Sequence, residues 1–494
     1  MQFLGIDLGS SSIKVAVIDG SSGKTIGQAQ YPKQEMEIIS KQSDWAEQEP
    51  EVWFDYLKKA IKEVLSSSGV AGNDIGAIGI SYQMHGLVLV DKDQKVIRPS
   101  IIWCDSRAVS IGDKAEKELG EEWALTHLLN SPGNFTASKL KWVKENEPEL
   151  FDKVYKFMLP GDYIAMRLSG EITTTITGLS EGIFWDFDKN VISDKLLRYY
   201  GFDKSMIPDI VEGFGEQVKL KEDIAGELGL KAGIPVTYRA GDQPNNAFSL
   251  NVLNPGEVAA TAGTSGVVYA VADKKVYDLK SRVNVFAHVN HIKETERLGV
   301  LLCVNGTGIQ YAWLRRLMGT ERFDYPALNE MAESVAPGSG GVMCFPFGNG
   351  AERMLGNVNP GAQFSGINFN IHQDKHIVRA AVEGIAFSFY YGMKIINEMG
   401  IETKVIRAGM ANLFQSKVFA KTLATLSGAT IELYNTDGSV GAARGAGLGS
   451  GYYTSSKEAF ANLKKLKVIE PDNSNVTKYR DVYNNWKVKL EELI

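Results

Sequence analysis

Cysteine is scarce in this sequence, and it contains neither a long hydrophobic run nor a block of like charge. The three cysteines, Cys104, Cys303 and Cys344, are odd in number and far apart, so we predict neither a disulfide framework nor a zinc site. No apolar run reaches the length of a membrane-spanning helix, and the N-terminus lacks the pattern of a signal peptide. A net charge of −6 argues against a nucleic-acid partner held by bulk electrostatics. We therefore expect a cytoplasmic protein without membrane or nucleic-acid partners.

The chain of 494 residues is too long for one hydrophobic core, and its length predicts at least two domains. Its 44% apolar and 23% charged residues are typical of a globular protein. No low-complexity linker divides the chain, and residues 236–247 join its two halves. We predict an N-terminal domain of residues 1–245 and a C-terminal domain of residues 246–494, which share a broad interface.

The most informative segment is the opening GIDLGSSSIK of residues 5–14. Strand-forming residues flank the turn Gly9-Ser10-Ser11, which predicts a β-hairpin. Gly9 lets the backbone approach an anion, and successive N–H groups in such a turn form an anion-binding nest. Asp7, at the strand end, is placed to attract Mg²⁺ directly or through water. Taken alone, the segment is equally compatible with an ordinary hairpin that has a polar turn.

A second hairpin is predicted about half a chain later, at residues 258–270. Apolar strand residues again flank a polar turn, which contains Gly263 and Thr264. The repetition suggests an internal duplication, with one phosphate-binding hairpin opening each half. In this respect the chain resembles the superfamily of actin, Hsp70 and sugar kinases.

Two glycine-containing segments do not fit the nucleotide motifs that they suggest. Ser22-Gly23-Lys24-Thr25 resembles the end of a P-loop, but Ile18 occupies the position of the required first glycine, and a strand rather than a helix is predicted to follow. Residues 438–451 do not match the G-x-G-x-x-G pattern cleanly. Their interspersed alanines predict a tightly packed helix instead.

Five motifs narrow the resemblance to the FGGY carbohydrate kinases, and among them to the xylulose kinases, over essentially the whole chain. They are the opening hairpin, QMHG at 83–86, WCDSR at 103–107, TASKLKW at 136–142 and the segment 362–383. Each is weak alone, but their order and spacing together are specific. The resemblance implies an α/β fold with two actin-like, ribonuclease H-like domains. Each would contain a mixed five-stranded sheet flanked by helices, with a cleft between the domains.

Asp242 is the strongest candidate for catalysis. It follows the predicted strand 236–238 in the sequence Ala240-Gly241-Asp242-Gln243. By resemblance it is the catalytic base, which would accept a proton from the sugar hydroxyl as that oxygen attacks the γ-phosphorus in line. The alternative is an aspartate that caps the helix after it.

The resemblance also implies a sugar site. Gln83 and His85 would supply polar groups, Met84 and Trp103 an apolar wall, and Asp242 the reacting carboxylate. Asp105 and Arg107 would either contact the sugar or form a structural ion pair, and we weigh these two interpretations equally.

For the nucleotide, the resemblance implies contacts from both hairpins and from two later turns. Gly409 would lie in a glycine-rich strand-to-helix turn against which adenine lies flat, although a plain turn is the alternative. We interpret Lys14 as a solvated hairpin lysine rather than a phosphate ligand. The residues expected at ATP and its phosphates are Gly9, Ser10, Ser11, Gly263, Thr264, Gly306, Gln310, Gly409 and Asn412.

These observations predict a phosphotransferase that uses ATP and Mg²⁺ to convert D-xylulose to D-xylulose 5-phosphate. Three departures from the family pattern leave the sugar open: Gln243, Asn134, and the absence of an aspartate from residues 173–182. The alternatives are a kinase of ribulose, a deoxyketose, gluconate or glycerol, and a non-catalytic actin-like ATP-binding sensor. A homodimer is common in the family that the chain resembles.

Overall fold

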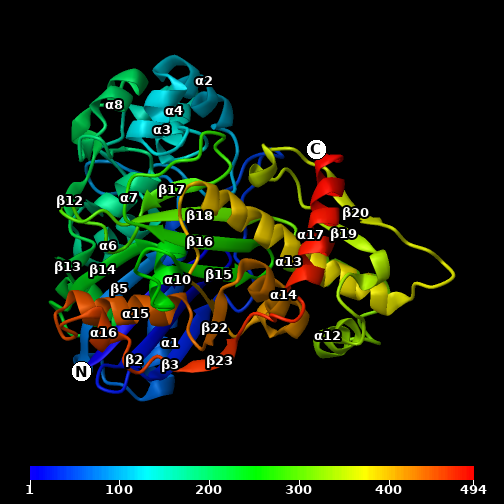
Figure 1. Cartoon of the computed structure of the whole chain (residues 1–494). Helices are drawn as coiled ribbons and strands as arrows, with labels where there is room; N and C mark the ends of the chain where they lie inside the picture. Colours follow the sequence, from blue (N-terminus) through cyan, green and yellow to red (C-terminus); the bar gives the residue numbers. More distant parts are fainter. The chain divides into compact units, whose positions relative to one another are not determined.

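A computed structural model describes residues 1–494, which form two compact units. Unit 1 comprises Met1–Asn251, Phe286–Leu298 and Thr436–Leu463, and unit 2 comprises Val252–Val285, Gly299–Asn435 and Lys464–Ile494. Each unit is built on a mixed β-sheet with helices packed on it (Figure 1). The domain boundary after residue 245 stays a prediction.

The sheet of unit 1 has six strands, in the order β13-β14-β5-β1-β2-β3. β1 runs antiparallel to β2 and parallel to β5, and β5 runs parallel to β14. The carboxyl ends of β1, β5 and β14 therefore meet at one edge, the usual place for ligand sites in open α/β sheets. The strands are β1 (Gln2–Leu8), β2 (Ile13–Asp19), β3 (Thr25–Tyr31), β5 (Ile75–Tyr82), β13 (Phe214–Lys219) and β14 (Pro235–Gly241).

Helix α15 (Gly438–Gly449) packs on this sheet, and the prediction of a tightly packed helix here is confirmed. The strand glycines below it make the close approach possible. A Cβ atom on Gly5 would lie 1.9 Å from the Ser439 carbonyl oxygen, and one on Gly79 would lie 2.0 Å from that of Ala442. No side chain fits at such distances, so glycine sets how closely the helix backbone lies on the strands.

Apolar residues recur at helical spacing over residues 49–66, which predicts an amphipathic helix. This helix is α1 (Pro50–Ser68), whose Trp53, Leu57, Ile61 and Val64 are buried in the core of unit 1. The stretch 110–200 is mainly helical, with short strands between the helices. The remaining elements of unit 1 are β4 (Glu47–Gln48), β6 (Val88–Val90), β7 (Ser100–Ile101), α2 (Val109–Leu119), α3 (Glu121–His127), α4 (Thr136–Asn146), α5 (Pro148–Phe151), β8 (Lys156–Met158), α6 (Pro160–Ser169), β9 (Thr173–Thr175), α7 (Ile176–Glu181), β10 (Trp185–Asp186), β11 (Val191–Ile192), α8 (Asp194–Tyr200), β12 (Asp209–Val211), α9 (Glu222–Leu228), α10 (Asp242–Ser249) and α16 (Ser456–Ala459).

The second sheet has seven strands, in the order β17-β18-β16-β15-β21-β22-β23. The second predicted hairpin is present as β15 and β16, which pair antiparallel, and β15 runs parallel to β21. The elements are β15 (Glu257–Ala262), β16 (Gly266–Ala272), β17 (Asn284–Ala287), β18 (Leu298–Val304), α11 (Gly308–Met318), α12 (Tyr325–Glu333), β19 (Met343–Phe347), β20 (Gly361–Ser365), α13 (Asp374–Glu398), β21 (Val405–Gly409), α14 (Lys417–Ser427), β22 (Thr430–Tyr434), β23 (Lys465–Ile469) and α17 (Val476–Glu491).

Both sheets are larger than the five strands expected from the sequence. The additional strands lie at the edges: β13 at one edge of the first sheet, and β17 and β23 at the two edges of the second. The sequences of β13 (FGEQVK) and β23 (KLKVI) are rich in polar residues, and most of their side chains are partly or fully exposed. Edge strands carry such polar residues, which weakens the signal of a strand in the sequence.

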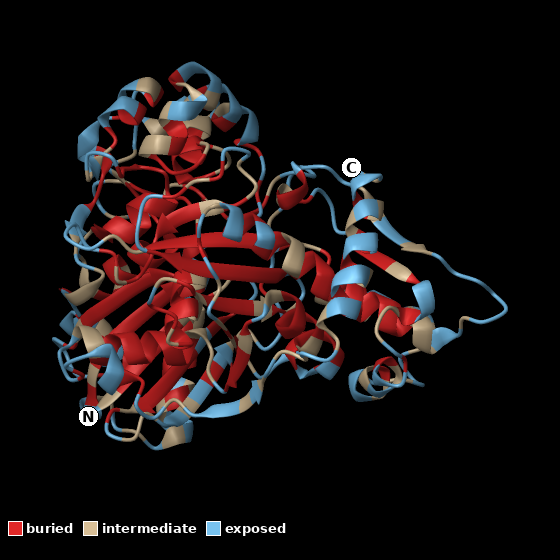
Figure 2. Ribbon diagram, in the orientation of Figure 1, coloured by how far each residue is buried: buried red, intermediate tan, exposed pale blue.

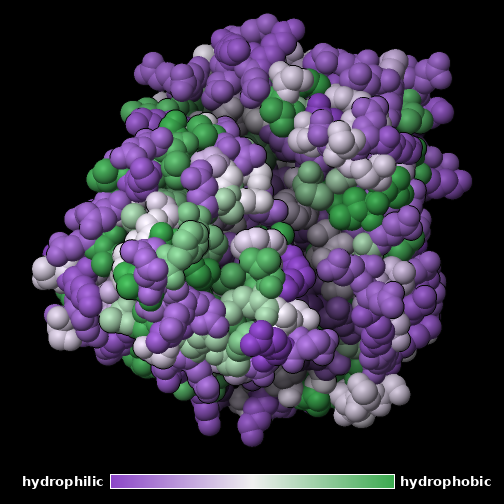
Figure 3. Space-filling model, turned by 90° about the vertical axis from the view of Figure 1, so that its right-hand side faces the viewer, coloured by the Kyte–Doolittle hydropathy of each residue, from purple (hydrophilic) through white to green (hydrophobic).

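The inner strands are buried in both sheets, whereas exposed residues lie on outer helices and loops (Figure 2). The face drawn in Figure 3 is mostly hydrophilic, with hydrophobic residues in separate groups. None of the helices is long and apolar enough to cross a membrane.

The close contact between α15 and β5 can be tested with Gly79→Ala. The added methyl group would overlap the Ala442 carbonyl oxygen, so we expect the free energy of unfolding to fall by about 2 kcal/mol or more. Gly226→Ala is the control, because Gly226 lies on the exposed side of α9 with no atom within 4 Å of a new Cβ. This variant should gain up to about 1 kcal/mol. Equal denaturation midpoints for the two variants would contradict the packing described here.

Candidate active site

Asp7 lies at the carboxyl end of β1, between the strands on either side of it. In the sheet register it faces Ser81 of β5 and Lys14 of β2. The Ser81 hydroxyl donates a hydrogen bond of 2.8 Å to Asp7 Oδ1. The first residue of α15 is Gly438, where a Cβ atom would lie 2.4 Å from Asp7 Oδ2. A helix N-terminus, which favours negative charge, thus abuts this carboxylate.

Asp242 follows the carboxyl end of β14 and is the first residue of α10. Because β1, β5 and β14 are parallel, Asp242 and Asp7 lie at the same edge of the sheet. Burial and, second to it, the negative charge of Asp7 together raise the pKa of Asp242 to about 7. Burial and the charge of Asp437 raise the pKa of Asp7 in turn, against the opposing effect of its hydrogen bond from Ser81. A carboxyl group that titrates near neutral pH is suited to general-base chemistry.

The predicted sugar residues at 83–85 follow β5 at this same edge. Met84 is buried, and a Cβ atom on Gly241 would lie 2.6 Å from Met84 Cγ, so Met84 packs directly against the residue before Asp242. His85 has a positive φ of 61°, and its Nδ1 lies 3.0 Å from the Glu181 carbonyl oxygen. Because a carbonyl oxygen only accepts, Nδ1 carries the proton in this contact.

The other two predicted sugar residues are linked to the Gly9–Ser11 turn. Trp103 is 54% exposed, and its indole N–H donates to Ser10 Oγ at 3.2 Å. Gln83 is buried and donates to Gln48 Oε1 at 3.3 Å. Gln48 in turn donates from Nε2 to the Ser10 carbonyl oxygen at 2.7 Å. The structure therefore connects the predicted phosphate turn with the predicted sugar segment through Gln48, a residue that no sequence motif indicated.

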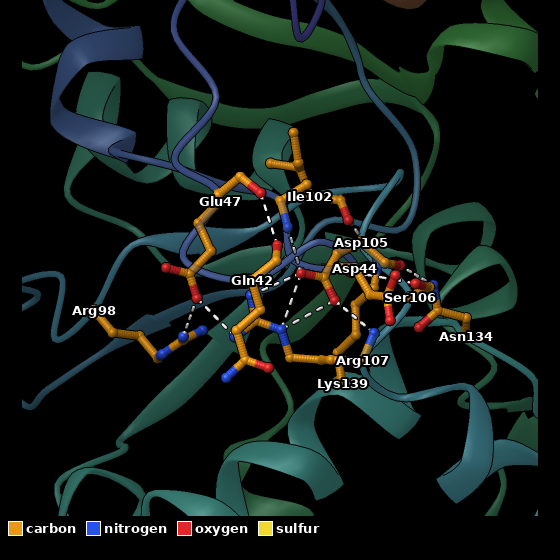
Figure 4. A network of polar contacts seen from close by, with 12 residues as sticks. Gln42, Asp44, Glu47, Arg98, Ile102, Asp105, Ser106, Arg107, Asn134 and Lys139 are labelled. Atoms are coloured by element: carbon orange, nitrogen blue, oxygen red, sulfur yellow. Dashed lines mark hydrogen bonds and ion pairs between the residues drawn. The ribbon is translucent and has the colours of Figure 1, made fainter.

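For Asp105 and Arg107 the structure supports the ion-pair interpretation. Both side chains are buried, and Arg107 Nη2 lies 2.7 Å from Asp105 Oδ2. Arg107 also pairs with Glu47, which pairs with Arg98, and the Arg107 guanidinium stacks 3.8 Å from the centre of the Trp45 ring. Figure 4 shows these ion pairs, which join Glu47 to Arg98 and Arg107, residues that lie before and after Trp103 in the sequence.

A pocket of about 510 Å³ lies in unit 2, where the turn of the second hairpin meets the start of α11. The N–H groups of Gly308 and Ile309 donate to the carbonyl oxygens of Gly263 and Thr264, at 2.8 and 3.0 Å. This contact fixes the turn against the helix. The pocket is lined by Ala262, Gly263, Thr264, Gly308, Ile309, Tyr311, Ala312, Arg316, Tyr325, Asn329, Asn412, Leu413 and Gln415.

Of the six predicted nucleotide residues in unit 2, Gly263, Thr264 and Asn412 line this pocket. The other three do not. Gln310 is buried and donates to Cys344 Sγ at 3.5 Å. Gly306 packs so closely that a Cβ atom would lie 1.4 Å from the Pro346 carbonyl oxygen. Gly409 ends β21 and accepts from the Ala411 N–H, as in a plain turn. These contacts give the three residues structural roles, and their part in nucleotide binding stays a prediction.

The pocket also includes residues that sequence reasoning missed. They come from one face each of α11 and α12, where Tyr311, Ala312 and Arg316 lie opposite Tyr325 and Asn329. No motif marks them, since an aromatic or small residue at helical spacing has the same pattern when it lies in a core.

The carboxylates can be compared with the needs of Mg²⁺. The structure contains no group of three or more His, Cys, Asp or Glu side chains that could hold a metal ion. Mg²⁺ at phosphate-transfer sites uses one or two carboxylates together with water and phosphate oxygens. Asp7 and Asp242 fit that requirement, since they lie near enough for the charge of Asp7 to contribute, after burial, to the raised pKa of Asp242.

The raised pKa of Asp242 predicts how its replacement changes stability. Between the unfolded-state pKa of 3.8 and about 7, the folded protein binds more protons than the unfolded chain, so stability falls as pH rises through this range. Asp242→Asn removes the group. We expect the variant to be more stable than the wild type by about 1 kcal/mol or more at pH 8, since one pKa unit corresponds to about 1.4 kcal/mol. The gain should shrink toward pH 4 in urea denaturation, and a gain independent of pH would contradict the assignment.

Two family models match the chain. The FGGY family of carbohydrate kinases, N-terminal domain, matches residues 2–249, and the C-terminal domain of the same family matches residues 258–448. Among curated relatives, the xylulose kinase of Bacillus subtilis (strain 168) is 29% identical, over 98% of this chain and 95% of its own length. That of Escherichia coli (strain K12) is 28% identical, over 90% of this chain and 88% of its own length.

Solved structures share the fold over the full length of the chain. A xylulose kinase from Rhodospirillum rubrum matches with a TM-score of 0.89 at 22% identity, covering 100% of this chain and 99% of that one. A gluconate kinase from Lactobacillus acidophilus matches with 0.89 at 21%, and the Plasmodium falciparum glycerol kinase with ADP matches with 0.87 at 20%, each covering 100% of this chain and 98% of the other. The two-domain α/β fold and the phosphotransferase class predicted from the sequence are thereby confirmed. The chain belongs to the FGGY family of carbohydrate kinases.

Proposed function

We propose that this sugar kinase transfers the γ-phosphoryl group of ATP to the terminal hydroxyl of D-xylulose, giving D-xylulose 5-phosphate and ADP. The observation that carries the proposal is the Asp242 carboxyl group, which titrates near pH 7 and directly follows the glycine that packs on Met84. The choice of sugar is supported by the QMHG segment and by curated relatives named xylulose kinase.

In the proposed reaction, Asp242 accepts the proton of the sugar hydroxyl. The oxygen attacks the γ-phosphorus in line, a new O–P bond forms, and the bond between the γ-phosphorus and the β–γ bridging oxygen breaks, so ADP leaves. A carboxyl group with a pKa of about 7 is about half ionised at pH 7, and its ionised form is basic enough to take the proton as the nucleophile loses it. Met84, packed at this position, would limit the orientations open to the sugar.

Phosphate binding is assigned to the two hairpin turns. The backbone N–H and hydroxyl groups of Gly9, Ser10 and Ser11 in unit 1, and of Gly263 and Thr264 in unit 2, are donors of the kind that stabilise charge on a transferring phosphoryl group. Asp7, with Asp242 nearby, would hold Mg²⁺, which supplies positive charge to the phosphate oxygens when bound.

The nucleotide is assigned to the pocket of unit 2. Its volume of about 510 Å³ lies within the range of small-molecule sites. Tyr311 is buried and donates its hydroxyl to Asn329 Oδ1 at 3.0 Å, which fixes a ring on the pocket wall. Aromatic and small side chains there suit the flat face of adenine, and Arg316 adds a positive charge. Gly306, Gln310 and Gly409 do not line this pocket, so they would affect the nucleotide indirectly, by supporting the segments that form the pocket.

Other ketoses and polyols remain alternatives to D-xylulose. Gln243 follows the proposed base as in the glycerol-kinase pattern, and structures named gluconate kinase and glycerol kinase share the fold. Ribulose and deoxyketoses belong to the same set. A non-catalytic sensor is less well supported, because Asp7, Asp242 and both hairpins are retained. A cytoplasmic location and a homodimeric state stay predictions.

The direct test is release of ADP in a coupled assay with Mg·ATP and D-xylulose. We expect sugar-dependent turnover in the wild type and a loss of about 10²–10⁴-fold in kcat/KM in Asp242→Asn, the contribution typical of a general base. Asp223→Asn, at an exposed position of α9, is the matched control and should keep full activity. Turnover of D-xylulose that survives in Asp242→Asn would contradict the role of Asp242.

If the wild type does not turn over D-xylulose, that substrate is rejected, and ribulose, a deoxyketose, gluconate and glycerol are assayed next. Absence of turnover with the whole panel, while ATP still binds, would favour the sensor.

The nucleotide pocket is tested with Ala312→Trp, which places an indole ring in it. We expect the KM for ATP to rise at least tenfold, with the KM for the sugar changed less than about twofold, since the added ring removes volume only from the pocket of unit 2. Leu317→Trp is the control on the same helix, because Leu317 is 68% exposed and does not line the pocket. Equal effects of the two variants on ATP would contradict this location.

A further inference from the structure

Lys139 is a completely buried lysine whose ammonium group contacts backbone rather than a carboxylate. It lies in the first turns of α4, with no exposed surface. Its Nζ donates to the carbonyl oxygen of His85 at 2.9 Å and to that of Ile102 at 2.9 Å. A buried charge is costly unless its surroundings compensate for it, so a lysine held in this way calls for an explanation.

The two carbonyl oxygens belong to the two segments that carry the proposed sugar residues. His85 is itself one of them and follows Met84, and Ile102 immediately precedes Trp103. The segments come from different strands, since the first follows β5 and the second follows β7. One nitrogen atom therefore joins the backbones of both, as Figure 4 shows in part for Lys139 and Ile102.

The backbone at His85 depends on such support. Its φ of 61° is in the left-handed region, which costs free energy for a residue with a side chain. The start of α4 supplies further contacts to the same two segments. The Thr136 hydroxyl donates to the Gly86 carbonyl oxygen at 3.4 Å, and the Asn134 side chain donates to the carbonyl oxygen of Asp105. Lys139 is the only one of these side chains that bonds to both segments at once.

A negative charge near Lys139 favours the charged ammonium group, but no carboxylate forms a direct ion pair with it. Burial lowers the pKa of Lys139 to about 8, and the negative charge of Asp105 opposes this. Arg107 donates from Nε to Asp105 Oδ1 and from Nη2 to Asp105 Oδ2, so Asp105 acts on Lys139 as a nearby charge rather than as a direct partner. The donors of Lys139 are thus directed to the two carbonyl oxygens.

We propose that Lys139 is a positioning residue for the sugar site: by donating to the carbonyl oxygens of His85 and Ile102, it fixes the spacing between the Met84–His85 segment and Trp103. The inference rests on the proposed sugar kinase activity and adds a residue that determines how well the sugar, and not the nucleotide, is bound. Lys139 does not contact the reacting atoms. It acts through the backbone of His85 and Ile102, which position the residues that we assign to the sugar.

The test measures the KM for the sugar and the KM for ATP separately in Lys139→Met and Lys141→Met, with the sugar that the wild type phosphorylates best. Methionine has a similar length but no donors. We expect Lys139→Met to raise the KM for the sugar at least tenfold and to change the KM for ATP less than about twofold. Lys141 lies two residues along the same helix in a surface pair with Glu145, and its variant should behave as the wild type. An unchanged sugar KM in Lys139→Met, or an equal rise in both KM values, would overturn the proposal.

Lys139→Arg keeps the test decisive if the methionine variant does not fold. Arginine retains the charge, but its larger planar guanidinium cannot reproduce the compact ammonium group in the same buried space, so the contacts with the two carbonyl oxygens must change. We expect a rise in sugar KM of at least threefold, with the KM for ATP kept. Wild-type values for both substrates would refute a positioning role. Failure of the proposed function is distinguishable, because then the wild type itself would phosphorylate none of the sugars.

Discussion

Two carboxylates that repel each other, Asp7 and Asp242, are held at one edge of the sheet of unit 1, and the proposed chemistry depends on this. Their proximity follows from strand direction. β1, β5 and β14 are neighbours and parallel, so the residues at their carboxyl ends come together although more than 200 positions separate them in the sequence. Folding free energy from the buried strands outweighs the repulsion. Burial first, and this repulsion second, raise the pKa of Asp242, which is the property a base needs near neutral pH.

Around this edge, the side chains that hold the site are polar and buried. Gln48 bonds to the Gly9–Ser11 turn and to Gln83, and Arg107 bonds to Asp105 and Glu47. Lys139 bonds to the two segments that carry the proposed sugar residues. Buried hydrogen bonds are directional, and leaving one partner unpaired is costly. Such contacts fix backbone positions more narrowly than apolar packing does. They explain how a segment as irregular as residues 83–86, with a positive φ at His85, keeps one conformation.

The elements that the sequence predicted best are those defined by local patterns. Both hairpins, helix α1 and the packed helix α15 follow from spacing of apolar residues and from glycine. The position of Asp242 at the end of a strand is confirmed, whereas its role as the base stays a prediction. Gln48 and Glu181 were missed, because their importance lies in contacts with residues distant in the chain. The residues of the pocket in unit 2, which we assign to the nucleotide, were predicted in part. Its turn residues belong to motifs, whereas Tyr311 and Tyr325 lie on helix faces with no distinctive pattern. The edge strands β13 and β23 were missed because their polar residues weaken the alternation that marks a strand.

The most direct test of this account is the titration of the Asp242 carboxyl group by ¹³C NMR, with the resonance assigned from Asp242→Asn. The account predicts a midpoint near pH 7 in the wild type and a lower one in Asp7→Asn, because loss of the Asp7 charge removes one of the two causes of the shift. A midpoint near the ordinary value of 3.8, or the same midpoint with and without the Asp7 charge, would contradict it.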